Sequence, residues 1–301
     1  MAINVIKYKK IRIWLFGKED HMAVFYEDHG PDFDFYYHPS PVGGNMAGMH
    51  IHPHYEVALT LEPVHSVHYV NNVKVELDTA FLTICAPFCL HKSLHEIGAE
   101  TERTAFHFGD KMIEEFAPAF ECIKKYQNVQ AVFFPISREI AGKIEPIFRI
   151  FIKKHPRSIE QKLMFLAILN TVIHSVNEDE IIHTGGTTSY IHDVICHINQ
   201  HYNEPLTVEN IAQTFFISRS KLTSDFKSYT GTTIHQLLNE IRINRAVYIF
   251  HYEKWSSIQE VAERIGMGDS SQFYIVFKKA TGESPLRYVK SRPYLARNMQ
   301  K

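Results

Sequence analysis

Three histidines and one glutamate in the first hundred residues have side chains that can bind a metal ion or a polar ligand. His50 and His52 are separated by one residue, Glu56 follows four residues after His52, and His91 lies further along the chain. Imidazole nitrogens together with a carboxylate suit a first-row divalent metal that keeps open coordination positions. A metal ion held by these four side chains is one interpretation.

A second interpretation gives these histidines no metal. His54 creates a His52-x-His54-x-Glu56 pattern, and neutral imidazoles often line a pocket or form internal hydrogen bonds. We favour this interpretation and predict no cofactor, with a metal ion as the competing hypothesis. The same side chains are then candidate contacts for a small-molecule effector: His50, His52, His54, Glu56 and His91.

A different group of side chains, in the last hundred residues, has the spacing of two exposed helix faces. Hydroxyl, amide and cationic groups on such faces can bond to DNA phosphates or to base edges, although each one can also be merely solvated. The first face presents Arg219, Ser220, Thr223, Ser224 and Lys227. The second presents Ser271, Gln272, Ile275 and Lys278. We predict that these nine residues contact DNA.

The elements that carry these two faces repeat within the chain. An amphipathic i, i+3, i+4, i+7 spacing occurs at Val208, Ile211, Ala212 and Phe215, and about fifty residues later at Ile258, Val261, Ala262 and Ile265. A second helix follows in each copy, and Gly231 or Gly282 ends it. We expect Ser218, Asp269 and a Ser257-Ile-Gln-Glu260 capping box to begin three of these helices. Each copy is predicted to be a helix-turn-helix unit.

A long amphipathic helix is predicted between the two units, from Ile234 to about His251. It would hold the units at a fixed separation. Arg242 and Arg245 lie on it, and we predict that they contact DNA phosphates. The alternative is a generic helical bundle with helix-turn-helix corners by chance.

Several motifs of this repeat together resemble a known pattern. They are Ile258-x-x-Val-Ala262, Gly266-Met-Gly-Asp-Ser270, Phe277-Lys-Lys-x-x-Gly282 and Pro285-x-x-Tyr288. On these motifs, residues 190–293 resemble the DNA-binding domain of the AraC/XylS family of bacterial transcription regulators. The resemblance implies double-stranded DNA as a partner. Phe216 is a departure, because the family usually has Gly in this turn; if a positive φ is needed there, the turn is strained or differently built.

The N-terminal half carries a second resemblance. Gly44, His50-x-His52 and Glu56 resemble the first half of the metal-binding motif of cupin barrels, and His91 resembles part of the second half. On this resemblance, His50, His52, Glu56 and His91 are the candidate metal ligands. Pro63 stands where the motif has its closing Gly. The resemblances imply a concave barrel that takes a small-molecule effector such as a sugar or a related metabolite. They also imply adjacent helices that mediate homodimer formation.

The fold class expected from these patterns is α+β. It combines an N-terminal cupin-like β-barrel and its packed helices with a C-terminal all-α domain of two helix-turn-helix units. Strand-like alternation, with a tight turn at Asn71-Asn72, gives way to helical spacing from about Lys111. The expected boundaries are 1–110 for the effector-binding barrel, 111–182 for a helical packing and dimerisation region, 183–189 for a linker and 190–301 for the DNA-binding domain.

The charge is distributed unevenly along the chain. Residues 1–189 hold 18 Lys and Arg against 23 Asp and Glu, whereas residues 190–301 hold 14 against 10. A positive excess in the C-terminal part suits contact with phosphates.

The apolar runs are shorter than the ~20 residues of a membrane span, and the N-terminus lacks the features of a secretion signal. The four cysteines contain no C-x-x-C pair. We therefore expect a cytoplasmic protein with reduced thiols and no membrane contact.

These observations favour a sequence-specific DNA-binding transcription regulator, an activator or a repressor, controlled by a small molecule bound in the N-terminal barrel. We expect no catalytic residues. The alternative function is a metal-dependent cupin enzyme that carries a DNA-binding appendage.

Overall fold

The structure is a computed structural model of the chain. It describes residues 11–15, 24–26, 33–38, 49–63, 65–71, 73–95, 103–126, 129–154, 158–184 and 189–292, together with Leu295 and Met299. The chain divides into two compact units, one of residues 1–20 and 31–189 and one of residues 21–30 and 190–301. Gly44, Asn72 and positions 185–188 of the expected linker lie outside the described residues.

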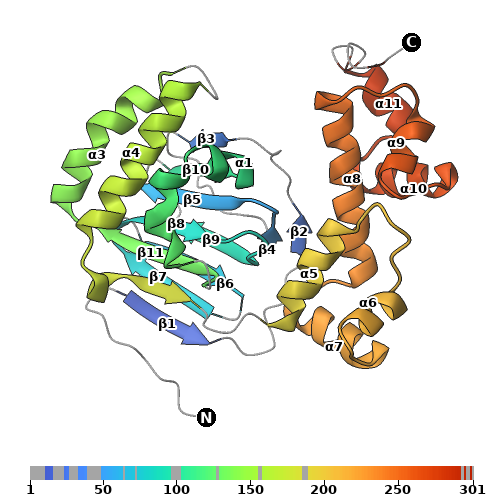
Figure 1. The fold of residues 1–301 in the computed structure, drawn as a ribbon, viewed down its shortest axis with the longest axis horizontal. Helices are drawn as coiled ribbons and strands as arrows, with labels where there is room; N and C mark the ends of the chain where they lie inside the picture. The colour runs from blue at the N-terminus through green and yellow to red at the C-terminus, as the bar shows by residue number, and fades with distance from the viewer. Residues whose placement is uncertain are drawn as a thin grey trace. The chain divides into compact units, whose positions relative to one another are not determined.

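Two antiparallel sheets build the first unit (Figure 1). Within this unit the first sheet has the order β1-β7-β6-β9-β4. Its strands are β1 (Ile11–Leu15), β4 (Met49–Ile51), β6 (His65–Val70), β7 (Val73–Asp78) and β9 (His91–His95). The second sheet has the order β12-β11-β8-β5-β10-β3. Its strands are β3 (Asp34–His38), β5 (Tyr55–Thr60), β8 (Ala80–Cys85), β10 (Arg103–Phe108), β11 (Ala131–Ile136) and β12 (Ile182–Thr184).

The β6–β7 hairpin forms at the predicted turn. Val70 pairs with Val73, and Asn71 adopts a positive φ of 51°. Asn tolerates this left-handed conformation better than most residues. The local sequence thus determines where this hairpin turns.

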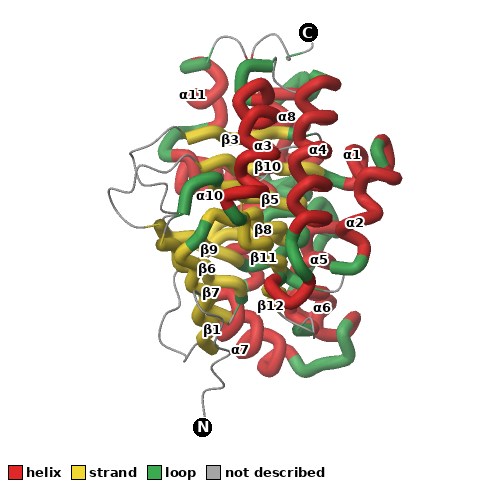
Figure 2. The backbone as a smooth tube through the Cα atoms, turned by 90° about the vertical axis from the view of Figure 1, so that its left-hand side faces the viewer, coloured by secondary structure: helices red, strands yellow, loops and turns green. Residues whose placement is uncertain are grey.

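Helices cover one face of the second sheet. They are α1 (Asp110–Glu115), α2 (Glu121–Lys124), α3 (Arg138–Phe151) and α4 (Ile159–Ser175). Val57 and Leu59 of β5 and Phe106 of β10 share a core with Phe148 of α3 and Phe165 of α4. The long helices α3 and α4 lie side by side over the sheet (Figure 2). The opposite face of the sheet is left for a second, inner core.

The inner core lies between the two sheets. Val75 and Leu77 of β7 pack there with Phe81 of β8, Phe133 of β11 and Ile182 of β12. Because successive strand residues point to opposite faces, Glu56, which alternates with Val57 in β5, faces this inner side. The inner space therefore has an apolar part and a polar part.

Strands β11 and β12 differ from the expected layout, which placed helices at 111–182 and a linker at 183–189. β11 pairs with β8 from Ala131 to Ile136, and β12 pairs with β11 up to Thr184. β11 is buried on both faces, so its apolar side chains do not alternate with polar ones. His183 and Thr184 belong to a strand because they pair with Val132 and Ala131.

The second unit is almost entirely helical. Its helices are α5 (Tyr190–Gln200), α6 (Val208–Thr214), α7 (Arg219–Thr230), α8 (Ile234–Tyr252), α9 (Ile258–Arg264), α10 (Ser270–Thr281) and α11 (Pro285–Lys290). The short strand β2 (Val24–Tyr26) lies against α8. α8 contacts α5 and α7 on one hand and α9 and α10 on the other. It connects the two predicted helix-turn-helix units, α6–α7 and α9–α10 (Figure 1).

No helix in the described parts of the chain combines the length and the apolar character needed to cross a membrane.

Candidate DNA-binding surface and buried histidine cluster

Side-chain caps begin the second helix of each helix-turn-helix unit. The Ser218 hydroxyl accepts a hydrogen bond from the Lys221 N–H at 3.2 Å at the start of α7. Asp269 Oδ1 accepts from the Ser271 and Gln272 N–H groups at 2.8 and 3.3 Å at the start of α10. Both caps occur where the sequence predicted them. They satisfy helix N–H groups that have no partner within the helix.

The predicted capping box of α9 forms only in part. Ser257 Oγ accepts from the Glu260 N–H at 3.0 Å, as expected. The Glu260 carboxylate accepts from the Ser256 N–H at 2.6 Å. A reciprocal box occurs at α8, where Thr233 and Gln236 each bond to the other's backbone.

The turns of the two units share a left-handed residue at equivalent positions. Gly266 has φ 74° in the second helix-turn-helix unit, and Phe216 has φ 55° in the first helix-turn-helix unit. The first turn is therefore built like the second despite its lack of Gly. A non-Gly residue in this region is strained, and the Phe216 side chain is 95% exposed.

The predicted face of α7 lies on the surface of the unit. All five of its residues are exposed: Arg219, Ser220, Thr223, Ser224 and Lys227. Leu222 and Phe226 on the other side of the helix are fully buried. Arg219 forms an ion pair with Glu209 at 2.9 Å, so a DNA phosphate would compete with that carboxylate for the guanidinium.

The predicted face of α10 has the same arrangement. Ser271, Gln272, Ile275 and Lys278 are exposed, whereas Phe273 and Phe277 are buried in the core of the second unit. Ile275 is 71% exposed. An apolar side chain on such a face can contact the methyl group of thymine.

Arg242 and Arg245, the predicted phosphate contacts of α8, bond to other groups of the protein. Arg242 Nε donates to the Tyr202 carbonyl at 2.7 Å, and its Nη2 donates to the Glu204 carbonyl at 2.9 Å. Arg245 forms an ion pair with Glu253 at 2.5 Å. Both are partly buried. Their groups bond within the protein, so we leave them out of the candidate DNA-binding surface.

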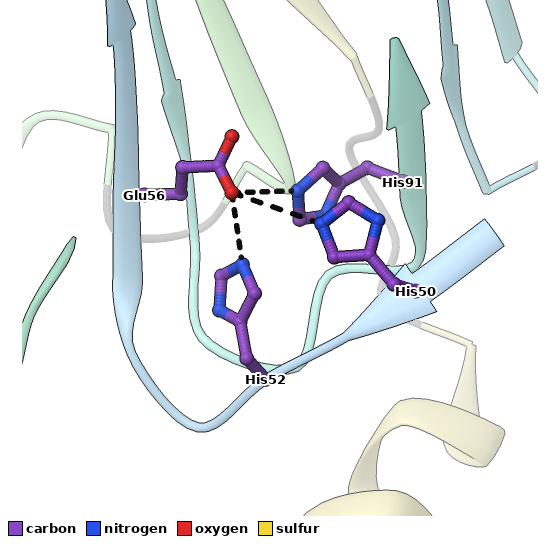
Figure 3. Close-up of side chains that lie close together, drawn as sticks. All are labelled: His50, His52, Glu56 and His91. Carbon is purple, nitrogen blue, oxygen red and sulfur yellow. Dashed lines mark hydrogen bonds and ion pairs between the residues drawn. The ribbon is translucent and has the colours of Figure 1, made fainter. Parts of the chain in front are cut away.

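In the first unit, the four candidate metal ligands converge on one point between the sheets (Figure 3). Glu56 Oε2 lies 3.7 Å from His50 Nε2, 3.2 Å from His52 Nε2 and 3.3 Å from His91 Nε2. His50 and His91 are direct cross-strand partners in β4 and β9, while Glu56 comes from β5 of the opposite sheet. All four side chains are buried.

His107 also belongs to this cluster, although the sequence analysis did not identify it. It pairs directly with Glu56 across β10 and β5, and its Nε2 lies 3.1 Å from Glu56 Oε2. Phe106 and Phe108 on either side of His107 pack in the helix-covered core. That alternation was the available signal, since it turns His107 to the inner face.

His54 has a supporting position. Its backbone carbonyl accepts the His52 Nδ1–H at 2.9 Å, and its side chain is not one of the four that converge in Figure 3. The Cys89 carbonyl accepts the His91 Nδ1–H at 2.9 Å in the same way. Backbone carbonyls thus fix the orientation of two of the imidazoles.

The surroundings lower the pKa values of Glu56 and His52 and raise that of His91. Burial alone would raise the pKa of Glu56, but the imidazoles around it outweigh burial and hold that pKa well below its usual range. Burial lowers the pKa of His52 to about 3, against the opposing effect of Glu56. Burial would lower the pKa of His91, but Cys85 and Glu56 outweigh burial and raise that pKa to about 10. The cluster therefore contains an ionised carboxylate between a neutral imidazole, His52, and a protonated one, His91.

Comparisons with known proteins agree on the C-terminal region. Residues 211–291 match a family described as "Helix-turn-helix domain". An uncharacterized response regulatory protein of Staphylococcus epidermidis is 30% identical over 127 residues, which are 39% of this chain and 49% of that protein. The HTH-type transcriptional activator RhaS of Salmonella schwarzengrund is 28% identical over 95 residues, 32% of this chain and 34% of that protein. The chain thus spans half or less of the length of these relatives.

Among solved structures, ToxT of Vibrio cholerae O395 is similar over most of the chain. It has 15% sequence identity and a TM-score of 0.46, and the match covers 86% of this chain and 96% of that chain.

Proposed function

We infer that this chain, whose C-terminal region is an AraC-type helix-turn-helix domain, is a sequence-specific DNA-binding transcription regulator. The observation that carries this conclusion is the repeated pair of units with exposed faces on α7 and α10. Each face combines hydroxyl or amide groups with a lysine, which suits simultaneous contact with base edges and phosphates. The proposal includes no catalytic step, and it places the protein in the cytoplasm with the DNA.

A binding experiment tests this function directly. The full chain, incubated with a pool of random double-stranded DNA, should enrich a specific sequence. Its affinity should fall steeply as salt rises, because bound phosphates release counterions. Lys227→Ala and Lys278→Ala should each weaken binding to the selected site. Lys143→Ala, on α3 of the first unit, is the matched charge control. Equal losses in all three variants, or no enriched sequence, would contradict the proposal.

The input that controls the regulator is proposed to act on the first unit. Buried polar groups between two sheets are suited to a polar ligand. A sugar or a related metabolite is the effector that resemblance implies. It is tested by measuring whether sugars change the DNA affinity of the full chain.

Homodimer formation is proposed to use α3 and α4. Ile150, Ile159 and Leu163 on these helices are each about half exposed, at 51%, 51% and 52%. Large apolar side chains gathered on a surface often mark an interface. Leu163→Lys should therefore yield monomers in sedimentation velocity. Leu286→Lys, which replaces an exposed leucine of the second unit, should leave the dimer intact.

A further inference from the structure

The buried cluster directs imidazole Nε2 atoms at a carboxylate. The His52 and His91 Nδ1 atoms each face a backbone carbonyl at 2.9 Å. A carbonyl oxygen only accepts hydrogen bonds, so both Nδ1 atoms carry the hydrogen. In the neutral imidazole, Nε2 then has a lone pair and no hydrogen. These are the atoms that point at Glu56 Oε2 from 3.2 and 3.3 Å.

His52, His91 and His107 direct their Nε2 atoms at the same Glu56 oxygen, at 3.2, 3.3 and 3.1 Å. These nitrogens and the carboxylate are ligand atoms of the kind that first-row divalent metals take. A metal ion bound among them would accept a lone pair from each Nε2, with the carbonyls holding the rings in place as outer partners.

His107 lies beside the other donors. The ligand atoms of His50, His52, Glu56 and His91 lie within 4.8 Å of one another, and the His107 Nε2 lies 3.1 Å from Glu56 Oε2. Each of these side chains is at most 5% exposed. Catalytic metal sites keep a position open for substrate, whereas closed sites hold the ion without turnover. A site built from five buried protein groups resembles the closed kind of metal site more than the catalytic kind.

A second group of possible ligands lies next to this one. Cys85 and Cys89 lie close to His91, with the three ligand atoms within 4.8 Å of one another. This group offers three donors and no carboxylate, and both cysteines also pack in the inner apolar core. The nitrogen and oxygen set has the larger number of donors and the fixed imidazoles, so it is the stronger candidate.

We propose that His50, His52, Glu56, His91 and His107 bind one first-row divalent transition metal ion per chain, and that this ion changes the affinity of the regulator for DNA. Imidazole and carboxylate donors suit Zn²⁺, Fe²⁺, Co²⁺ and Ni²⁺. A metal ion was the hypothesis that competed with our expectation of no cofactor. The ligand assignment stands by itself, whereas the signalling role rests on the regulator function proposed above.

The ion would act on DNA binding by favouring one state of the first unit. Glu56 and His107 come from the second sheet, while His50 and His91 come from the first. A metal bound to all of them joins the two sheets. Any ligand that prefers one state of a protein shifts its population toward that state.

Metal titration of the untagged full chain tests the ligand assignment. Protein stripped with a chelator and titrated with Co²⁺ should bind one ion and develop the visible absorption of a cobalt site. His52→Gln and His91→Gln should each weaken binding by about 100-fold or more. His107→Gln should retain an ion but change the cobalt spectrum, since one donor is lost. Circular dichroism checks that each variant is folded.

Two control variants distinguish this site from the neighbouring buried histidine and thiol groups. His68 is buried between the same sheets but bonds to the Ser66 and Ser93 hydroxyls at 3.0 Å. His68→Gln should therefore bind Co²⁺ like the wild type, and so should Cys85→Ser. Absence of binding by folded wild type would overturn the site. Binding that survives both His52→Gln and His91→Gln, or that is lost in Cys85→Ser, would overturn it as well.

The signalling role has its own readout. Co²⁺ should change the affinity of the wild type for its selected DNA by roughly 5- to 150-fold, with no such change in His52→Gln. An unchanged affinity with the site filled would overturn the signal and leave the metal site in place. No DNA binding with or without Co²⁺ would instead count against the proposed regulator function.

Discussion

The guanidinium of Arg242 joins α8 to the loop between α5 and α6, through hydrogen bonds to the Tyr202 and Glu204 carbonyls at 2.7 and 2.9 Å. Between these two residues, Asn203 lies against the turn of the second helix-turn-helix unit. A Cβ on Gly266 would meet the Asn203 carbonyl oxygen at 2.6 Å. The loop thus contacts the helix and the turn at once, and holds the two helix-turn-helix units together in addition to α8.

Replacing Arg242 should reduce stability more than it affects phosphate contact. Arg242→Met removes two charged hydrogen bonds from backbone carbonyls, which should lower the free energy of unfolding by about 2 kcal/mol. Thermal or urea unfolding measures this loss. The contrasting variant is Lys227→Ala, which should leave the free energy of unfolding unchanged. It should reduce by about 1 the salt slope, which is the slope of the logarithm of the DNA-binding constant against the logarithm of the salt concentration. If Arg242→Met instead kept wild-type stability and lost the salt slope, our account of Arg242 would be wrong.

Substitutions in the two turns should change the stability of the protein in opposite directions. Gly266→Ala puts a side chain at φ 74° and against the Asn203 backbone, so left-handed strain and overpacking should together cost about 2 to 4 kcal/mol. Phe216→Gly relieves strain at φ 55° and removes an exposed side chain. It should raise stability by about 0.5 to 1 kcal/mol. Urea unfolding of both variants checks the signs; a loss of stability in Phe216→Gly would contradict equivalent turns.

Local features of the second unit could be predicted from the sequence because short-range interactions determine them. The Ser218 and Asp269 caps are contacts within three residues of each other along the chain. The expected helix from Ile234 to about His251 differs from α8 by one residue. The exposed faces follow from helical spacing alone. The internal hydrogen bonds of Arg242 could not be predicted in this way, because the partner carbonyls lie about forty residues away.

The first unit was harder to predict because its site depends on strand pairing. His50, His52, Glu56 and His91 were identified from motif spacing. His107 joins them only through its register with Glu56 in β5, and no short motif contains that information. β11 was missed for a related reason, since burial on both faces removes the period-two pattern.

Acidification should destabilise the second unit through His251. Burial, aided by the charge of Arg292, lowers the pKa of His251 below its ordinary value. The folded state therefore binds fewer protons than the unfolded state, and stability rises with pH. The contribution is complete above about pH 6.5, the unfolded value, and is lost as the pH falls through the folded pKa. His251→Gln should show a smaller drop in melting temperature between pH 7.5 and 5.5; an equal drop would assign the effect to other groups.

The two helix-turn-helix units should read two separate parts of one DNA site. α8 has 19 residues and spans ~28 Å at 1.5 Å per residue, which approaches the ~34 Å between successive major grooves on one face of B-DNA. One chain should therefore protect two grooves of an asymmetric site. Gln272, exposed at the start of α10, should read bases in one groove only, and Gln272→Ala should relax discrimination there by ~1–3 kcal/mol. Ser224→Ala is the matched variant in α7, and its effect should fall on the other groove. Affinities for a set of singly substituted sites measure both profiles. A change spread equally over both grooves in either variant would show that the units do not read DNA independently.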